Sequence, residues 1–126
     1  MAKLISFDID GTLEVGEPPG SITMNMVRRA KGLGYLVGSC SDRPISSQRQ
    51  MWREHHIAVD FSVLKQQLGE LKIRFPAEEY CHVGDTELDH YFAERAGFHF
   101  VRADAALQRF WGADRATSTD FRKRAS

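Results

Sequence analysis

The chain has 126 residues, 42% of them hydrophobic and 27% charged, with 17 basic and 17 acidic side chains. This length and composition suit a single globular domain. The zero formal net charge argues against a long nucleic acid, because binding a phosphate backbone needs clustered cations, and leaves a phosphoprotein, a nucleic-acid end, a sugar phosphate or a nucleotide open as a substrate. No apolar run approaches the roughly 20 residues that span a bilayer, so no membrane partner is expected. The N-terminal residues lack a signal-peptide pattern and Cys40 and Cys81 form no CxxC pair, which together indicate a cytoplasmic protein with reduced thiols.

In the first half of the chain, short apolar runs alternate with helical patterns. The runs predict strands, and apolar residues at helical spacing between a capping residue and a stop predict helices. In chain order the predicted elements are a strand at 4–7, a Gly/Pro-rich loop at 16–20, a helix that Thr23 caps and Gly34 ends, a strand at 35–38, and a helix that starts near Pro44 and lasts to about residue 55.

The same alternation continues in the second half. The predicted elements are a strand at 59–63, a helix at 65–75, a strand at 80–83, a helix at 87–96 with Gly97 as its cap, a strand at 98–101 and a short helix at 105–111. We expect one core domain over residues 1–112 and a flexible polar tail over 113–126. Repeated strand–helix alternation predicts an α/β fold, a Rossmann-like three-layer sandwich around a mainly parallel five-stranded sheet.

Polar side chains follow four of the predicted strands. Asp8 and Asp10 follow the first, Ser41 and Asp42 the second, Lys65 the third, and Asp85 and Asp89 the fourth. Taken singly, Ser41 or Asp42 suits a helix cap and Lys65 a surface lysine. Ligands of parallel sheets bind beyond the carboxyl ends of the strands. The collection of these groups at one edge therefore indicates a functional site.

The order of these residues resembles the haloacid dehalogenase superfamily. The segment Asp8-x-Asp10-Gly11-Thr12 resembles its first motif, and Gly84-Asp85-Thr86-Glu87-Leu88-Asp89 resembles its acidic fourth motif, GDxxxD. Ser41 stands where the second motif places a Ser or Thr, and Lys65 where the third places a lysine. The resemblance runs from about Lys3 to Val101 and implies a phosphatase that forms an aspartyl-phosphate.

The resemblance assigns Asp8 as the nucleophile and Asp10 as the general acid and base. Attack by a carboxylate on phosphorus divides one difficult displacement into two easier ones, and a second acid can serve the proton transfers of both. Asp8 and Asp85, with the Asp10 carbonyl, are expected to bind Mg²⁺, which prefers oxygen ligands. Asp89 is expected to reach the metal through water, although a charge in the first turn of a helix is the alternative.

Ser41 and Lys65, together with Gly11, Thr12 and Asp42, are the expected phosphate-binding set. A hydroxyl, backbone N–H groups and a fixed positive charge stabilise the negative charge of a reacting phosphoryl group. Two further predictions concern cations: Lys72 is the rival of Lys65 but lies too far along the same helix, and Arg43 is either a substrate contact or a surface residue. His82, within a strand, is expected to be packed rather than reactive.

No cap domain is predicted over this site. Positions 13–40 provide 28 residues between Thr12 and Ser41, and positions 43–64 provide 22 between Asp42 and Lys65, too few for an inserted domain. Segment 16–20 is a candidate flap. An open site suits a large phosphorylated substrate, or a homo-oligomer in which a neighbouring subunit covers the site.

Several functions remain open at this point. Phosphotransfer to an alcohol could use the same intermediate, whereas the acid at position 10 argues against dehalogenation. A receiver-like signalling module and a non-catalytic phosphate- and metal-binding scaffold are the alternatives from other classes. The receiver is disfavoured because its acceptor follows the third strand, where this chain has no aspartate.

Overall fold

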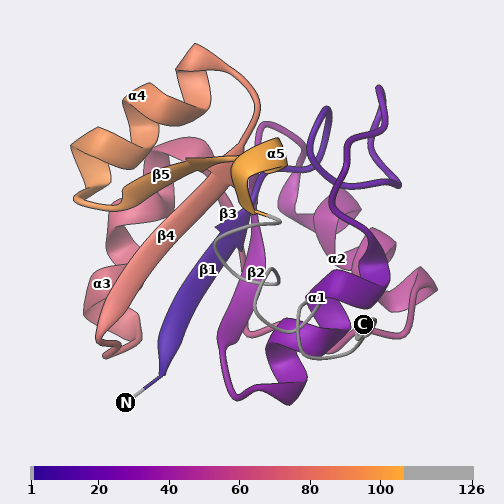
Figure 1. Cartoon of the computed structure of the whole chain (residues 1–126), viewed down its shortest axis with the longest axis horizontal. Helices are drawn as coiled ribbons and strands as arrows, with labels where there is room; N and C mark the ends of the chain where they lie inside the picture. The colour runs from indigo at the N-terminus through magenta and orange to yellow at the C-terminus, as the bar shows by residue number, and fades with distance from the viewer. Residues whose placement is uncertain (1, 107–126) are drawn as a thin grey trace, which may run out of the picture.

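Five parallel strands form the centre of the fold (Figure 1). The structure is a computed structural model that describes residues 2–106. The strands are β1 (Lys3–Phe7), β2 (Leu36–Ser41), β3 (Phe61–Leu64), β4 (Glu79–Gly84) and β5 (His99–Arg102), in the spatial order β3-β2-β1-β4-β5. All four strand pairings are parallel, so the prediction of a mainly parallel five-stranded sheet is confirmed.

Helices cover both faces of the sheet, which confirms the three-layer α/β architecture. One face carries α1 (Met24–Gly32), α2 (Ile45–Glu54) and α5 (Ala103–Ala106), and the other carries η1 (Lys65–Glu70), α3 (Leu71–Arg74) and α4 (Glu87–Ala96) (Figure 1). Each face has its own hydrophobic cluster. Ile5, Val27 and Trp52 belong to the first, and Leu4, Leu68 and Ala93 to the second.

The ends of the helices follow from local chemistry. The Thr23 hydroxyl accepts a hydrogen bond from the backbone N–H of Met26 at 3.1 Å, as expected of an N-cap. Gly97 has the left-handed φ of 77° that ends α4, and Gly34, with φ 91°, follows α1. Pro44 lies one position before α2, as its N-cap. The predictions for Thr23, Gly34 and Gly97 are therefore confirmed, whereas Pro44 was expected in the first helical turn and is the N-cap instead.

Several predicted elements have different bounds in the structure, among them β3, which begins at Phe61 rather than at Val59. The helix predicted at 65–75 is a 3₁₀ segment, η1, followed by the single α-helical turn α3. Gly69, a residue with poor helix propensity, lies within η1. β2 extends three residues beyond the predicted 35–38, so Ser41 is its last residue. The final helix begins at Ala103 rather than 105; its predicted end at 111 and the tail at 113–126 lie outside the described residues.

The two intervals in which a cap domain could be inserted hold only small elements. A loop and α1 fill positions 13–40 apart from the start of β2, and α2 and β3 fill positions 43–64. Neither interval contains a folded insertion. None of the described helices has the length and apolar character of a membrane span. Cys40 and Cys81 are both buried, and neither belongs to a disulfide among the described residues.

Candidate active site

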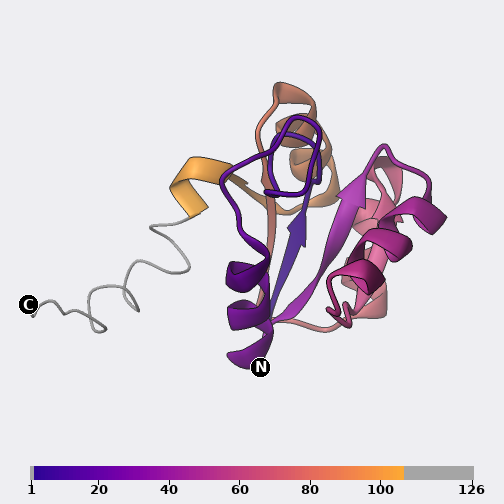
Figure 2. The ribbon, with the colours of Figure 1, turned by 90° about the vertical axis from the view of Figure 1, so that its right-hand side faces the viewer.

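The predicted site residues meet at the carboxyl ends of the central strands. β1 lies between β2 and β4, with Phe7 paired to Ser39 on one side and Val83 on the other. The long loop between β1 and α1 folds above the end of β1 (Figure 2). Beneath it lies an open depression of about 380 Å³, lined by Asp8, Asp10, Pro18, Ser41, Asp42, Lys65, Asp85, Thr86 and Leu88.

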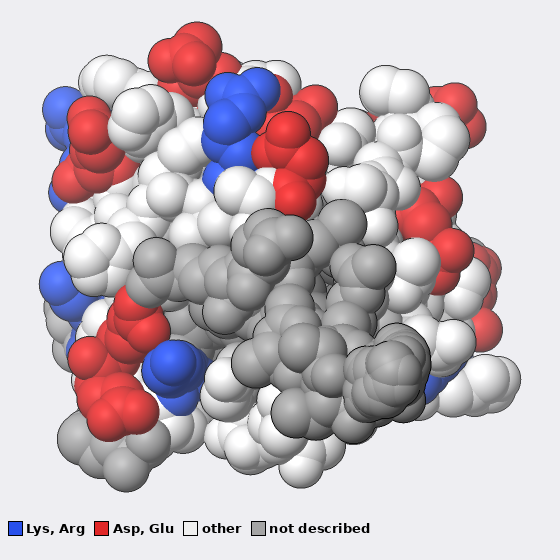
Figure 3. All heavy atoms as spheres, in the orientation of Figure 1, with Lys and Arg blue, Asp and Glu red and all other residues white. Residues whose placement is uncertain are grey.

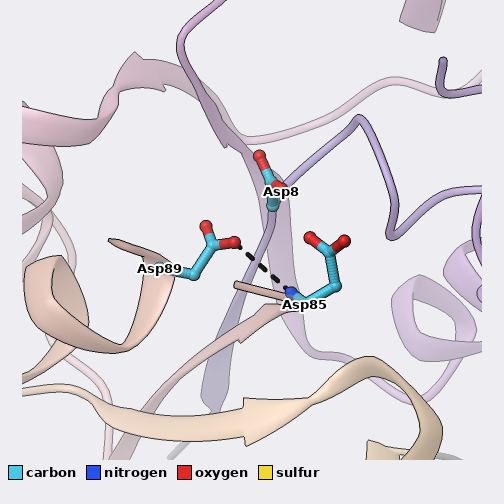
Figure 4. Close-up of side chains that lie close together, drawn as sticks. All are labelled: Asp8, Asp85 and Asp89. Atoms are coloured by element: carbon cyan, nitrogen blue, oxygen red, sulfur yellow. Dashed lines mark hydrogen bonds between the residues drawn. The ribbon is translucent and has the colours of Figure 1, made fainter. Parts of the chain in front are cut away.

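Three carboxylates lie close together at this edge of the sheet, and two of them, Asp8 and Asp85, line the depression. Asp8 follows β1, Asp85 follows β4 and Asp89 lies in the first turn of α4, and one oxygen of each lies within 4.8 Å of the others (Figure 4). The position of the Asp85 carboxylate depends on Gly11, because a Cβ at residue 11 would lie 2.0 Å from Oδ2 of Asp85. Its φ of 80° is also one that side-chain-bearing residues rarely adopt.

Both carboxylate oxygens of Asp89 are held by several neighbouring donor groups. Its Oδ2 accepts hydrogen bonds from the N–H groups of Asp85 and Thr86, both at 3.3 Å, and from the Thr86 hydroxyl at 3.0 Å. Its Oδ1 lies 3.0 Å from Nε2 of His82 and 3.3 Å from Nζ of Lys65. Burial opposes the charge, but the partners, His82 first, lower the pKa of Asp89. Asp89 therefore organises the loop that carries Asp85 and has no spare oxygen for a direct metal bond.

Asp8 and Asp85 have the spare acceptor capacity that Asp89 lacks. Oδ1 of Asp85 is buried and has no hydrogen-bond partner among the described residues. Asp8 is 5% exposed, and burial, followed by the charge of Asp89, raises its pKa to about 8 despite the opposing effect of Lys65. A cation between the two carboxylates would satisfy the unpaired oxygen and favour the ionised form of Asp8. The donor set consequently fits a hard divalent metal ion.

Lys65 is the lysine of the site. Its side chain is 6% exposed, and Nζ lies 3.8 Å from Asp8, 3.7 Å from Asp42 and 3.3 Å from Asp89. Burial disfavours its charge, but the three carboxylates outweigh burial and raise the pKa of Lys65. Lys72 points elsewhere, because its Nζ donates to the Gly97 carbonyl at 3.2 Å. The geometry agrees with the choice of Lys65 over Lys72.

Asp10 is paired with Arg43 at the edge of the depression. Arg43 Nη2 donates to Asp10 Oδ1 at 2.6 Å and Nε donates to Oδ2 at 3.2 Å. The backbone N–H of Glu17 also donates to Oδ1, at 2.8 Å. The hydrogen bond from Arg43 is the main cause that lowers the pKa of Asp10. Arg43 therefore contacts the predicted acid–base residue directly, and neither oxygen of Asp10 is free.

The remaining phosphate-binding candidates occupy different environments. Ser41 is 1% exposed, and its hydroxyl accepts a hydrogen bond from the Arg43 N–H at 3.1 Å. The Thr12 hydroxyl is buried without a partner among the described residues. The Gly11 N–H donates to the Pro18 carbonyl at 2.6 Å, so it is occupied within the loop. The Asp42 side chain is 76% exposed and faces the depression near Lys65.

His82 is a member of the site that was predicted only as a packed residue. It is fully buried in β4, with Nδ1 2.9 Å from the Ser6 hydroxyl and Nε2 on Asp89. The alternation of side chains along β4 could have predicted that His82 lies near Asp89. Cys81 and Val83 belong to the cluster on the α1 face, so His82 and Gly84 face α4, from which Asp89 projects.

Fold and site together define a parallel α/β protein with a carboxylate cluster and a buried lysine at the carboxyl ends of its strands. Comparisons with family models, curated proteins and solved structures find no match for the chain.

Proposed function

We propose that this chain is a Mg²⁺-dependent phosphomonoester hydrolase of the haloacid dehalogenase type, which acts through an aspartyl-phosphate on Asp8. The observation that carries the proposal is the juxtaposition of Asp8 with Lys65 and Asp85. A buried carboxylate stands at the end of the central strand, with a lysine 3.8 Å away on one side and an acid with an unpaired oxygen on the other. Nucleophile, cation and metal ligand thus share one depression.

The first chemical step is attack of an Asp8 carboxylate oxygen on the phosphorus of a monoester. A new oxygen–phosphorus bond forms, the bond to the leaving oxygen breaks, and that oxygen takes a proton from Asp10. Mg²⁺ held by Asp8 and Asp85, when bound, supplies charge neutralisation for the phosphoryl group. Lys65 and the Ser41 hydroxyl stabilise the negative charge on the other phosphoryl oxygens.

The second step is hydrolysis of the acyl phosphate. Asp10 takes a proton from a water molecule whose oxygen attacks phosphorus, and the bond between phosphorus and the Asp8 oxygen breaks. Inorganic phosphate and the Asp8 carboxylate are regenerated. An alcohol in place of water would give phosphotransfer by the same sequence of bonds.

The openness of the site supports a substrate that is larger than its phosphate group. The described chain places no cap over the depression, and Leu88, 47% exposed, and Pro18 provide an apolar rim. A broad substrate or a neighbouring subunit would cover this rim. On the described part of the face shown in Figure 3, basic side chains lie beside acidic ones at the left and top, the right edge is mostly acidic, and no extended basic region appears. This distribution gives no support to a long nucleic acid as the substrate.

A non-catalytic scaffold that binds metal and phosphate is the second candidate, favoured by the pairing of both Asp10 oxygens with other groups. A receiver-like module gains no support, because Asp8 follows the first strand and Lys65 the third.

A panel of phosphate esters, assayed for phosphate release with and without Mg²⁺, tests the proposal. We expect Mg²⁺-dependent release that Asp8→Asn abolishes. The matched control is Glu54→Gln, the same carboxylate-to-amide change at an exposed position near the end of α2, which should retain activity. Phosphate release by Asp8→Asn at the wild-type rate would exclude the mechanism. Mg²⁺ and phosphate binding without release from any ester would favour the scaffold.

A further inference from the structure

The hydrogen bonds between Arg43 and Asp10 conflict with the proton transfers expected of Asp10 as general acid and base. A general acid or base must present an oxygen to the leaving group or to water. In this structure Asp10 Oδ1 accepts from Arg43 and from the Glu17 N–H, and Oδ2 accepts from Arg43 Nε. Oδ1 therefore accepts two hydrogen bonds and Oδ2 one, and the two bonds from Arg43 fix the orientation of the carboxylate. Asp10 has to break those two bonds before it can turn an oxygen toward a leaving group or a water molecule.

The base of the Arg43 side chain is held firmly. Its backbone N–H donates to the Ser41 hydroxyl at 3.1 Å, and its carbonyl accepts from Gln48 Nε2 at 2.9 Å. Gln48 is fully buried and also donates to the Val63 carbonyl at 3.1 Å. These bonds tie the backbone of Arg43 to β2, β3 and α2, so only its side chain has freedom to change partner.

The guanidinium end of the Arg43 side chain can exchange its hydrogen-bond partner. In the Arg43–Asp10 ion pair the arginine side chain is 30% exposed and the aspartate side chain 39%. Solvent that reaches both side chains weakens the attraction between them. A phosphate monoester carries up to two negative charges and three acceptor oxygens, and it matches the planar guanidinium fork. Phosphate that enters the depression is therefore a strong competitor for Arg43.

We propose, on the basis of the phosphatase function above, that Arg43 exchanges hydrogen-bond partners when the substrate binds. In the resting site its guanidinium binds Asp10; when a phosphate monoester enters, the guanidinium moves to the phosphate and Asp10 is released. We call this exchange the latch. Arg43 then has two successive partners. In the free site it is a positioning residue for Asp10, and in the loaded site it contacts the substrate. Water that enters an empty site meets an Asp10 whose carboxylate is held in a fixed orientation by Arg43.

NMR of the arginine side chains tests this exchange of partners directly, with inorganic phosphate as the probe in the presence of Mg²⁺. The Nε–H signal of Arg43, assigned through its loss in Arg43→Lys, should shift when phosphate is added. Asp10→Asn should shift that signal in the free protein and leave it unchanged in the phosphate-bound protein. The Nε–H signal of Arg49, an exposed arginine of α2, is the internal control and should not move.

Affinity for phosphate provides a second readout. Arg43→Ala should weaken phosphate binding about tenfold, the lower end of the effect of losing a hydrogen bond to a charged group, whereas Arg49→Ala should not change it. Circular dichroism would verify the fold, and Arg43→Lys, which keeps the charge but loses the fork, replaces Arg43→Ala if the alanine variant is unfolded.

The outcomes separate the latch from the phosphatase function. If Asp10→Asn shifts the Arg43 Nε–H signal equally with and without phosphate, Arg43 and Asp10 stay paired when phosphate binds. That result would overturn the latch but not the phosphatase function. An unchanged phosphate affinity in Arg43→Ala would overturn it as well. Exchange of partners without hydrolysis of any ester would overturn the phosphatase function and leave the latch as a phosphate-binding device. Failure of the wild-type protein to bind phosphate would overturn both.

Discussion

Replacing Asp89 by asparagine should destabilise the protein strongly, although the change keeps the shape of the side chain. The carboxylate is fully buried and accepts from five donors on two sides. An amide offers one acceptor oxygen, and its NH₂ group must face either Lys65 and His82 or the N–H groups of Asp85 and Thr86. In either orientation at least one buried donor loses its acceptor.

The size of the effect follows from those contacts. Loss of a hydrogen bond to a charged group costs about 1.5–3 kcal/mol, and a buried donor left unsatisfied costs about 1–3 kcal/mol. Removing one charge from beside Asp8 and Asp85 offsets part of this loss. We therefore expect a net loss of about 3 kcal/mol in the free energy of unfolding, a large share of the 5–15 kcal/mol typical of a domain.

Urea denaturation followed by circular dichroism measures this free energy. The matched control is Asp42→Asn, because Asp42 also lies near Lys65, at 3.7 Å, but its side chain is 76% exposed. The control should lose less than about 0.5 kcal/mol. If Asp89→Asn lies within about 1 kcal/mol of the wild-type protein, or if the two variants are equally destabilised, Asp89 does not organise the loop as we infer.

Four further predictions concern the metal, the pH dependence, the lysine and the open site. At about ten times its dissociation constant, Mg²⁺ should stabilise the chain by about 1.4 kcal/mol, and Asp85→Asn should abolish the increase in melting temperature; Mg²⁺-induced stabilisation that persists in the variant would exclude Asp85 as a ligand. Because the pKa of Asp8 is raised from 3.8 to about 8, the metal-free folded chain retains a proton that the unfolded chain releases. This contribution makes the free energy of unfolding fall between about pH 4 and pH 8, and Asp8→Asn should flatten the decline measured by urea titration at each pH. Lys65→Met should lower kcat by more than about tenfold and Lys72→Met should not, and equal losses would contradict the assignment. Nitrophenyl phosphate should have a KM above about 1 mM, because the uncapped site contacts little besides its phosphate; tight binding by a protein that light scattering shows to be monomeric would contradict this prediction.

The fold was predictable because its signals are local. Apolar runs of strand length alternate with helical patterns, and parallel strands with right-handed crossovers then follow from the geometry of chain connection. The helix between residues 65 and 75 was predicted incorrectly as continuous because its apolar spacing is helical. The structure instead has a 3₁₀ segment, which packs against α4, followed by a single α-helical turn.

The residues that follow strands were also predictable, because parallel strands bring their carboxyl ends to one edge. Asp8, Ser41, Lys65 and Asp85 line one depression for this reason. Their identity as acids, a hydroxyl and a lysine led to the hypothesis of a metal with oxygen ligands and a phosphate substrate. The resemblance to a phosphatase family rests on the same residues.

Only the tertiary structure decided which partner each of these groups has. Spacing along the chain gives no information about contacts between Asp10 and Arg43, which are 33 positions apart, or between Ser6 and His82, which are 76 apart. The saturation of Asp89 likewise depends on how α4 packs against β4 and η1. Hydrogen-bond partners are set by side-chain directions in three dimensions, where a difference of about 1 Å separates a bond from a mere neighbour.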